Sequence, residues 1–173
     1  MKKSISLGLI IILILALLTA CGDSGSAPMG FKEISDEALT YHFYVPDEWT
    51  ADLSTGVTCA YYSGRDPSSI SVTAFELDTS ITGIDDYWAL SEAEFKQVFP
   101  DMEYVDISDC TLDGVGAKQY TYTASLGEDS YKFMQVVSIR NNQVYIITYT
   151  ALAENYDQHI EDVIAMLDYF DFK

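Results

Sequence analysis

Two histidines are the first candidates for acid–base chemistry in this sequence of 173 residues. His42 alternates with the apolar side chains of residues 41–45, so it would lie on the opposite face of a short strand. His159 lies beside the apolar stripe of a helix expected near the C-terminus, with Asp162 about one turn further on. We therefore expect a surface or sheet-edge histidine and a solvated His–Asp pair, and a catalytic role for neither.

The motifs of common enzyme classes are missing from the sequence. It contains no Gly-x-Ser-x-Gly elbow, no His-Glu-x-x-His pair and no glycine loop of the kind that binds phosphate. Cys59 lies in an apolar run without a neighbouring base, which argues against an activated thiol. We therefore expect no enzyme. A hydrolase with an unrecognised carboxylate site is the least favoured alternative.

Acidic side chains could supply oxygen ligands to Ca²⁺, yet their spacing does not match a known metal loop. Asp106 and Asp109 form one such pair, and Glu128 and Asp129 form another. Neither pair has the ligand spacing of an EF-hand. We interpret all of them as loop acids and predict neither a metal site nor a cofactor.

Cys59 and Cys110 form a candidate disulfide. Both lie in strand-like runs, and outside the cytoplasm a disulfide is permitted. Cysteines in such runs are also common as small buried side chains. A bridge requires a short Cα separation, which the sequence does not provide, so both alternatives stay open.

Cys21 follows a segment with the features of a secretory signal peptide. Lys2 and Lys3 precede an apolar run at 5–18, and small residues follow it. The run is shorter than the roughly 20 apolar residues of a spanning helix. Residues 18–21, Leu-Thr-Ala-Cys, resemble the bacterial lipobox, whose thiol is joined to a diacylglycerol and becomes the new N-terminus. We predict a signal peptide at 1–20 and lipidation of Cys21. The alternatives are an uncleaved anchor, a secreted protein or a buried cysteine.

The segment after Cys21 has the composition of a flexible tether, which we place at 21–30. A flexible chain of about nine residues reaches roughly 15–18 Å. The rest of the protein would therefore lie close to the bacterial cell membrane, on its extracytoplasmic side. We expect residues 31–173 to form a single domain.

The charge of the chain excludes one class of partner. Without Lys2 and Lys3, 7 basic residues face 27 acidic ones, a net charge of −20. Binding to nucleic acid depends on Lys and Arg, so we expect no nucleic-acid partner. The acidity is typical of a solubilising surface; the alternative is a surface for metal ions or for a basic protein.

The periodicity of the sequence predicts strands, a helix, further strands and a second helix. An apolar face of Ile84, Trp88, Phe95 and Phe99 predicts an amphipathic helix at 84–99, and a second helical stripe begins at Tyr156. Strands are expected at 41–45, 57–62, 70–77, 104–110, 118–125, 131–140 and 144–150. Asn141-Asn142 predicts a tight turn between the last two. The fold class is α+β: an antiparallel sheet with a helix on each face, or with both helices on one face.

Two stretches resemble the PsbP-like family. Residues 41–49, YHFYVPDEW, resemble its opening strand, Pro and Trp. Residues 144–172, VYIITYTALAENYDQHIEDVIAMLDYFDF, resemble its closing strand, helix and aromatic-x-Phe end. The resemblance spans nearly all of 31–173 and implies a PsbP-like α/β/α sandwich, an antiparallel sheet flanked by helices. A cystatin-like fold or an unrelated α+β fold is the alternative.

The best-known members of this family are extrinsic subunits of photosystem II, and others are bacterial lipoproteins of unclear role. The resemblance therefore implies a non-enzymatic accessory or binding module, without implying photosynthesis. We expect a membrane-anchored, extracytoplasmic lipoprotein that binds a protein partner. A lipoprotein that binds cations or a small ligand is the alternative.

Overall fold

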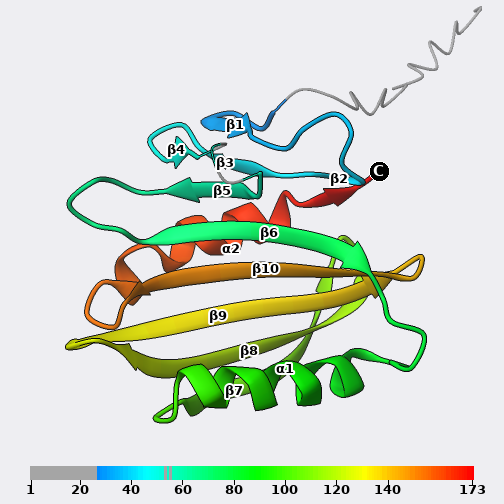
Figure 1. Cartoon of the computed structure of the whole chain (residues 1–173). Coiled ribbons are helices and arrows are strands. Elements are labelled where there is room, and N and C mark those ends of the chain that lie inside the picture. The colour runs from blue at the N-terminus through cyan, green and yellow to red at the C-terminus, as the bar shows by residue number, and fades with distance from the viewer. Residues whose placement is uncertain (1–26, 53, 55) are drawn as a thin grey trace, which may run out of the picture.

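A seven-stranded antiparallel sheet forms the centre of the computed structural model, which describes residues 27–52, 54 and 56–173 (Figure 1). From edge to edge, the strands follow the order β4 (Thr50–Ala51), β5 (Thr58–Tyr61), β6 (Ser69–Glu76), β10 (Gln143–Leu152), β9 (Asp129–Arg140), β8 (Val115–Leu126) and β7 (Glu103–Leu112). Consecutive strands are paired except where β10 lies beside β6. The predicted signal peptide and Cys21 lie outside the described residues.

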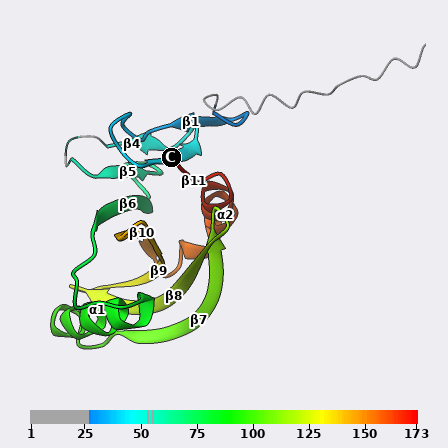
Figure 2. The ribbon, with the colours of Figure 1, turned by 90° about the vertical axis from the view of Figure 1, so that its right-hand side faces the viewer.

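The two α-helices cover opposite faces of this sheet: α1 (Ile84–Val98) lies on one face and α2 (Ile160–Asp168) on the other (Figure 2). Successive side chains of a strand point to opposite faces. In β10, Val144 accordingly packs in the cluster that includes α1, and Tyr145 in the cluster that includes α2. The structure thus has the expected α+β sandwich with one helix on each face.

The apolar face expected for the first helix is confirmed in α1. Trp88 is buried, and Ile84, Phe95 and Phe99 pack partly buried around the same core. The helix ends at Val98. Phe99 comes next and precedes Pro100, and a proline disfavours helical geometry in the residue before it. The burial of Trp88 therefore sets the position of α1 over the sheet.

The predicted strand at 41–45 is wrong as a single strand, because it is divided at Phe43. β2 (Tyr41–His42) pairs with the C-terminal strand β11 (Asp171–Phe172), whereas β3 (Tyr44–Pro46) pairs with β1 (Phe31–Glu33). At the division, the amide of Phe43 donates to the Ser35 hydroxyl instead of a strand partner. β1, β2 and β3 therefore lie together with the C-terminal strand β11, near α2 (Figure 1).

The helix expected from Tyr156 onward is also divided. A 3₁₀ turn, η1, spans Tyr156–Gln158, and α2 begins only after His159. Tyr156 and Val163 are buried as expected, but Ile164 is 50% exposed and does not belong to the buried stripe. His159 lies at this division, between η1 and α2.

The predicted tight turn at Asn141-Asn142 is confirmed, since the two residues have φ values of 52° and 61°. Asn tolerates this left-handed region better than most residues, and both central positions of the favoured hairpin turn require it. Across the residues that the structure describes, no helix is long and apolar enough to cross a membrane.

Candidate functional site

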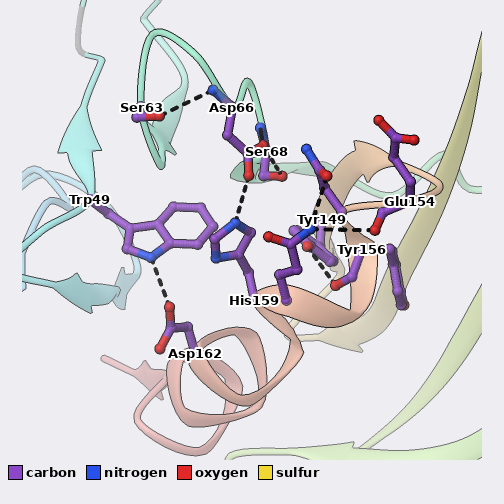
Figure 3. Close-up of polar contacts among 11 residues, drawn as sticks. Trp49, Ser63, Asp66, Ser68, Tyr149, Glu154, Tyr156, His159 and Asp162 are labelled. Carbon is purple, nitrogen blue, oxygen red and sulfur yellow. Dashed lines mark hydrogen bonds and ion pairs between the residues drawn. The ribbon is translucent and has the colours of Figure 1, made fainter.

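A buried polar cluster joins the loop between β5 and β6 to the start of α2 (Figure 3). His159 Nε2 lies 2.8 Å from Oδ2 of Asp66, and the two side chains are only 7% and 16% exposed. The hydroxyl of Ser68 donates to the other oxygen of Asp66 at 2.7 Å. The expectation of a solvated pair between His159 and Asp162 is therefore wrong.

Aromatic rings surround the imidazole of His159. The ring of Tyr62 lies 4.1 Å from it between centroids, and that of Trp49 lies 5.7 Å from it. Trp49 is fully buried, and its Nε1 donates to Asp162 Oδ2 at 3.2 Å (Figure 3). Asp162 thus binds Trp49 rather than His159. The partner of His159 is Asp66, in a loop 93 residues away along the chain.

The order of these hydrogen bonds does not match a hydrolase triad. In a triad, the serine hydroxyl is bonded to the imidazole, which takes its proton during attack. Here the hydroxyl of Ser68 is bonded to the carboxylate of Asp66, and Ser68 is fully buried. The arrangement suits a structural link between two segments, because every group in it already has a partner.

The surroundings of Asp66 stabilise its charged form. Burial by itself would raise the pKa of this carboxyl, but hydrogen bonds from Ser68 and His159 outweigh burial and hold the pKa at about 2. The unfolded chain would protonate Asp66 near the ordinary value of 3.8. The folded protein therefore binds this proton less readily than the unfolded chain does.

We expect this difference to make the protein less stable in acid. Asp66 contributes fully to the free energy of unfolding above pH 3.8, and the contribution falls as the pH drops towards about 2. The loss is about 2 kcal/mol for a shift of this size. Urea unfolding of the wild type and of Asp66→Asn between these pH values measures the loss. In the variant, the free energy of unfolding should fall less steeply as the pH drops.

Asp78 provides a matched control for this experiment. It accepts hydrogen bonds from the backbone and hydroxyl of Ser80, as Asp66 does from Ser68, but it is exposed and has no histidine beside it. Asp78→Asn should leave most of the acid slope unchanged. An equal loss of slope in both variants would show that the buried pair is not its main source.

The other candidate residues from the sequence, His42 and the four acids considered for Ca²⁺, do not form a common site. His42 is half-buried and its Nδ1 lies 2.7 Å from Glu33, so it is the expected sheet-edge histidine. The described residues include no group of three or more His, Cys, Asp or Glu side chains that could hold a metal ion. The candidate metal acids Asp106, Asp109, Glu128 and Asp129 are all exposed.

Cys59 and Cys110, the candidate disulfide, are both free thiols in the structure. Cys59 lies in β5 and Cys110 in β7, with β6, β10, β9 and β8 between these strands in the sheet. Burial raises the pKa of both thiols, with a smaller effect from a neighbouring aspartate in each case. Neither thiol therefore has the environment of a reactive nucleophile.

β7 is one of the two outer strands of the sheet, at the edge opposite β4 (Figure 2). All residues from Glu103 to Asp109 are exposed, although a strand with one covered face would alternate. α1 packs on β8, where Trp88 stacks on Tyr120, and it contacts β7 at Tyr104, whose hydroxyl accepts a hydrogen bond from Trp88 Nε1. Side chains on both faces of β7 are nonetheless exposed from Glu103 to Asp109, where solvent or a partner can reach them.

The two faces of β7 differ in chemistry, because residues paired across strands share a face. Tyr104 and Ile107 are paired with tyrosines of β8 that pack against α1. Glu103 and Asp106 are paired with threonines and so point to the opposite face. A bulge at Val105 adjusts the register between these positions. The side of α1 thus carries Tyr104 and Ile107, followed by Asp109 beside Lys118, and the other side carries Glu103 and Asp106.

An open cavity of about 600 Å³ lies between the start of α1 and the end of the β7–β8 hairpin. Lys118 is its only basic lining residue, with Nζ 2.6 Å from Asp85 and 3.9 Å from Asp109. The hydrogen bond to Asp85 raises the pKa of Lys118. No local sequence pattern predicts this cavity, because strand pairing brings residues distant in sequence together there.

Comparisons with known proteins identify the fold. No protein-family model matches the chain, and no curated protein matches its sequence. The cyanobacterial PsbP protein CyanoP of Synechocystis is similar in structure, with a TM-score of 0.62 and 17% identity, over 90% of this chain and 99% of CyanoP. LpqN of Mycobacterium tuberculosis, involved in cell envelope biogenesis, has a TM-score of 0.54 and 18% identity, over 83% of this chain and 90% of LpqN.

A protein of unknown function from Pseudomonas aeruginosa, PA94, is similar as well. Its TM-score is 0.59 at 17% identity, over 80% of this chain and 94% of PA94. Similarity at such low identity establishes the fold alone. The chain therefore has a PsbP-like α+β fold, as the resemblance implied.

Proposed function

We propose that this chain is a lipid-anchored bacterial envelope protein that acts as a non-enzymatic accessory module and binds a protein partner through β7. One observation carries the proposal: Glu103 to Asp109 form a long outer strand that is exposed on both faces. Exposed apolar side chains on a single face are typical of interaction surfaces. Tyr104, Val105 and Ile107 are 37%, 56% and 49% exposed.

The chemistry of the described residues supports a binding role rather than catalysis. His159, Asp66 and Ser68 bind one another in the interior, and His42 is bonded to Glu33. CyanoP and LpqN share the fold, and LpqN is involved in cell envelope biogenesis. Together with the signal and lipobox residues before Cys21, these observations favour an accessory protein of the cell envelope.

The cavity beside α1 favours a second candidate function, binding of a cation or a small cationic ligand. Asp85, Asp86 and Asp109 line it. Asp85 already binds Lys118, however, and Asp86 accepts a hydrogen bond from Thr82. A thermal-shift series with Ca²⁺, Mn²⁺, Zn²⁺ and polyamines separates the two functions, because a ligand of the folded state raises Tm.

Crosslinking in native membranes tests the proposed function. We expect the wild-type protein to give a specific crosslinked partner at useful stoichiometry and Cys21→Ala to be released from the membrane. Two acyl chains hold a protein stably at a bilayer, and none remain in this variant. Membrane retention of Cys21→Ala would contradict the anchor, and the absence of any partner at good expression would contradict the accessory role.

A further inference from the structure

We infer that the partner contributes an extended segment in which Lys or Arg alternate with apolar residues, and that this segment pairs with the open edge of β7. The inference rests on the proposed function, because it specifies how the protein partner binds. It follows from three features of β7: an unpaired edge, two faces of different chemistry, and a charge that selects the occupant.

The edge of β7 is open along its exposed part, from Glu103 to Asp109. Within the part of the chain that the structure describes, β7 pairs with β8 and with no other strand. An outer strand presents backbone amides and carbonyls that a further strand can satisfy. Extended peptides bind to many proteins in this way, with backbone hydrogen bonds giving affinity and alternate side chains giving specificity.

The two faces of β7 define the sequence of the added strand. Side chains of a paired strand would alternate between the face of Tyr104 and Ile107 and the face of Glu103 and Asp106. Apolar residues suit the first face beside Tyr104 and Ile107, since Ile107 is 49% exposed there, whereas Asp109 further along this face is paired with Lys118. Basic residues suit the second, because opposite charges across strands are favourable and like charges are not. The matching segment therefore alternates basic and apolar residues.

The charge of β7 favours such a segment over a second copy of this chain. Edge-to-edge pairing of two β7 strands would bring Glu103, Asp106 and Asp109 of each copy close to those of the other. The chain is also strongly acidic overall, with a net charge of −18 including its N-terminal lysines. Acidic side chains and a bulge on an outer strand are devices that prevent self-association. The same acids would attract a basic strand.

A direct binding experiment uses a fluorescent peptide of about nine residues, alternating Lys and Val, which is long enough to span the exposed part of β7 from Glu103 to Asp109. Fluorescence anisotropy measures its Kd for the full chain. A peptide of the same composition, with all Lys at one end, is the control. We expect the alternating peptide to bind at least about tenfold more tightly, because only it places every Lys on one face.

Charge reversal on the protein locates the binding site. Asp106→Lys should weaken binding of the alternating peptide about tenfold, since it replaces an attraction by a repulsion. Asp168→Lys changes the net charge equally at an exposed position of α2 and should leave Kd within about twofold. Equal losses in the two variants would indicate non-specific attraction and overturn the inference.

N-methylation of the peptide tests strand pairing itself. Methyl groups on the amides of one set of alternate residues block the hydrogen bonds that face β7, whereas methyl groups on the other set face solvent. We expect one methylated peptide to lose binding and the other to retain it. Retention by both would overturn strand addition, even if charge still mattered.

This inference and the proposed function can fail separately. A native partner that crosslinks equally to the wild type and to Asp106→Lys would support the accessory role and contradict binding at β7. Failure to recover a partner in native membranes would contradict the proposed function itself. Peptide binding that depends on Asp106 but not on Asp168 would still support the inferred mode of strand binding at β7, although the physiological partner would not have been found.

Discussion

Replacing His159 with Ala is expected to lower the free energy of unfolding by about 3 kcal/mol, because it leaves the buried Asp66 carboxylate without its partner. The imidazole also fills the space between Trp49 and Tyr62, so its removal creates a cavity. The link between the β5–β6 loop and the start of α2 would be lost at the same time. Urea unfolding at neutral pH measures the change.

His42→Ala is the matched control, since the same side chain is removed from a half-exposed position beside Glu33. Exposed ion pairs contribute about 0–1 kcal/mol, so this variant should lose no more than that. A loss for His159→Ala as small as that for His42→Ala would show that the buried pair does not hold the two segments together. It would also reopen a functional role for the imidazole.

Replacing Trp88 with Ala is expected to cost about 4 kcal/mol, because large aromatic side chains in a core contribute this much. The indole stacks on Tyr120 with centroids 3.6 Å apart and rings 7° from parallel. Its Nε1 donates to the Tyr104 hydroxyl at 2.7 Å, which ties α1 to the outer strand β7. Hydrogen exchange in β7 should therefore accelerate along with the loss of stability.

Leu90→Ala is the control on the same helix, because Leu90 is 58% exposed and points away from the core. Substitutions at such surface positions usually change stability by less than about 0.5 kcal/mol. Similar losses of stability in both variants would contradict a specific contribution from the Trp88 stack. If Trp88→Ala lowered the overall stability but did not accelerate hydrogen exchange in β7 beyond that in the other strands, the hydrogen bond to Tyr104 would not be what holds β7 in place.

Periodicity alone predicted most of the secondary structure. Alternating aromatic and β-branched residues marked the long strands, and Asn141-Asn142 marked a turn that needs left-handed backbone geometry. The helix at 84–99 was clear because its apolar side chains recur with helical spacing. These signals are local, so a single sequence contains them in full.

The predictions from local sequence patterns were wrong where contacts between distant segments determine the structure. Residues 41–45 alternate like one strand, but the C-terminus pairs with the first part and the N-terminal segment with the second. His159 appeared to neighbour Asp162 because their spacing fits a helix. The chain breaks before α2 instead, and His159 binds Asp66 in a distant loop. Local spacing contains no information about such contacts.

The candidate binding surface could not be predicted for a related reason. β7 and β8 have similar strand patterns, yet β8 is largely buried and β7 is exposed. The difference comes from the order of strands in the sheet, which places β7 at the edge. The exposed apolar residues of β7 become meaningful only once that order is known.

Photocrosslinking in native membranes tests binding through β7 most directly. A photoreactive residue at Ser108 lies on this strand, and one at Asp168 lies on α2 as a control at an equally exposed position. We predict a specific protein adduct from Ser108 in the lipidated protein and none from Asp168. Equal adducts from both positions, or an adduct from Asp168 alone, would contradict partner binding at the outer strand.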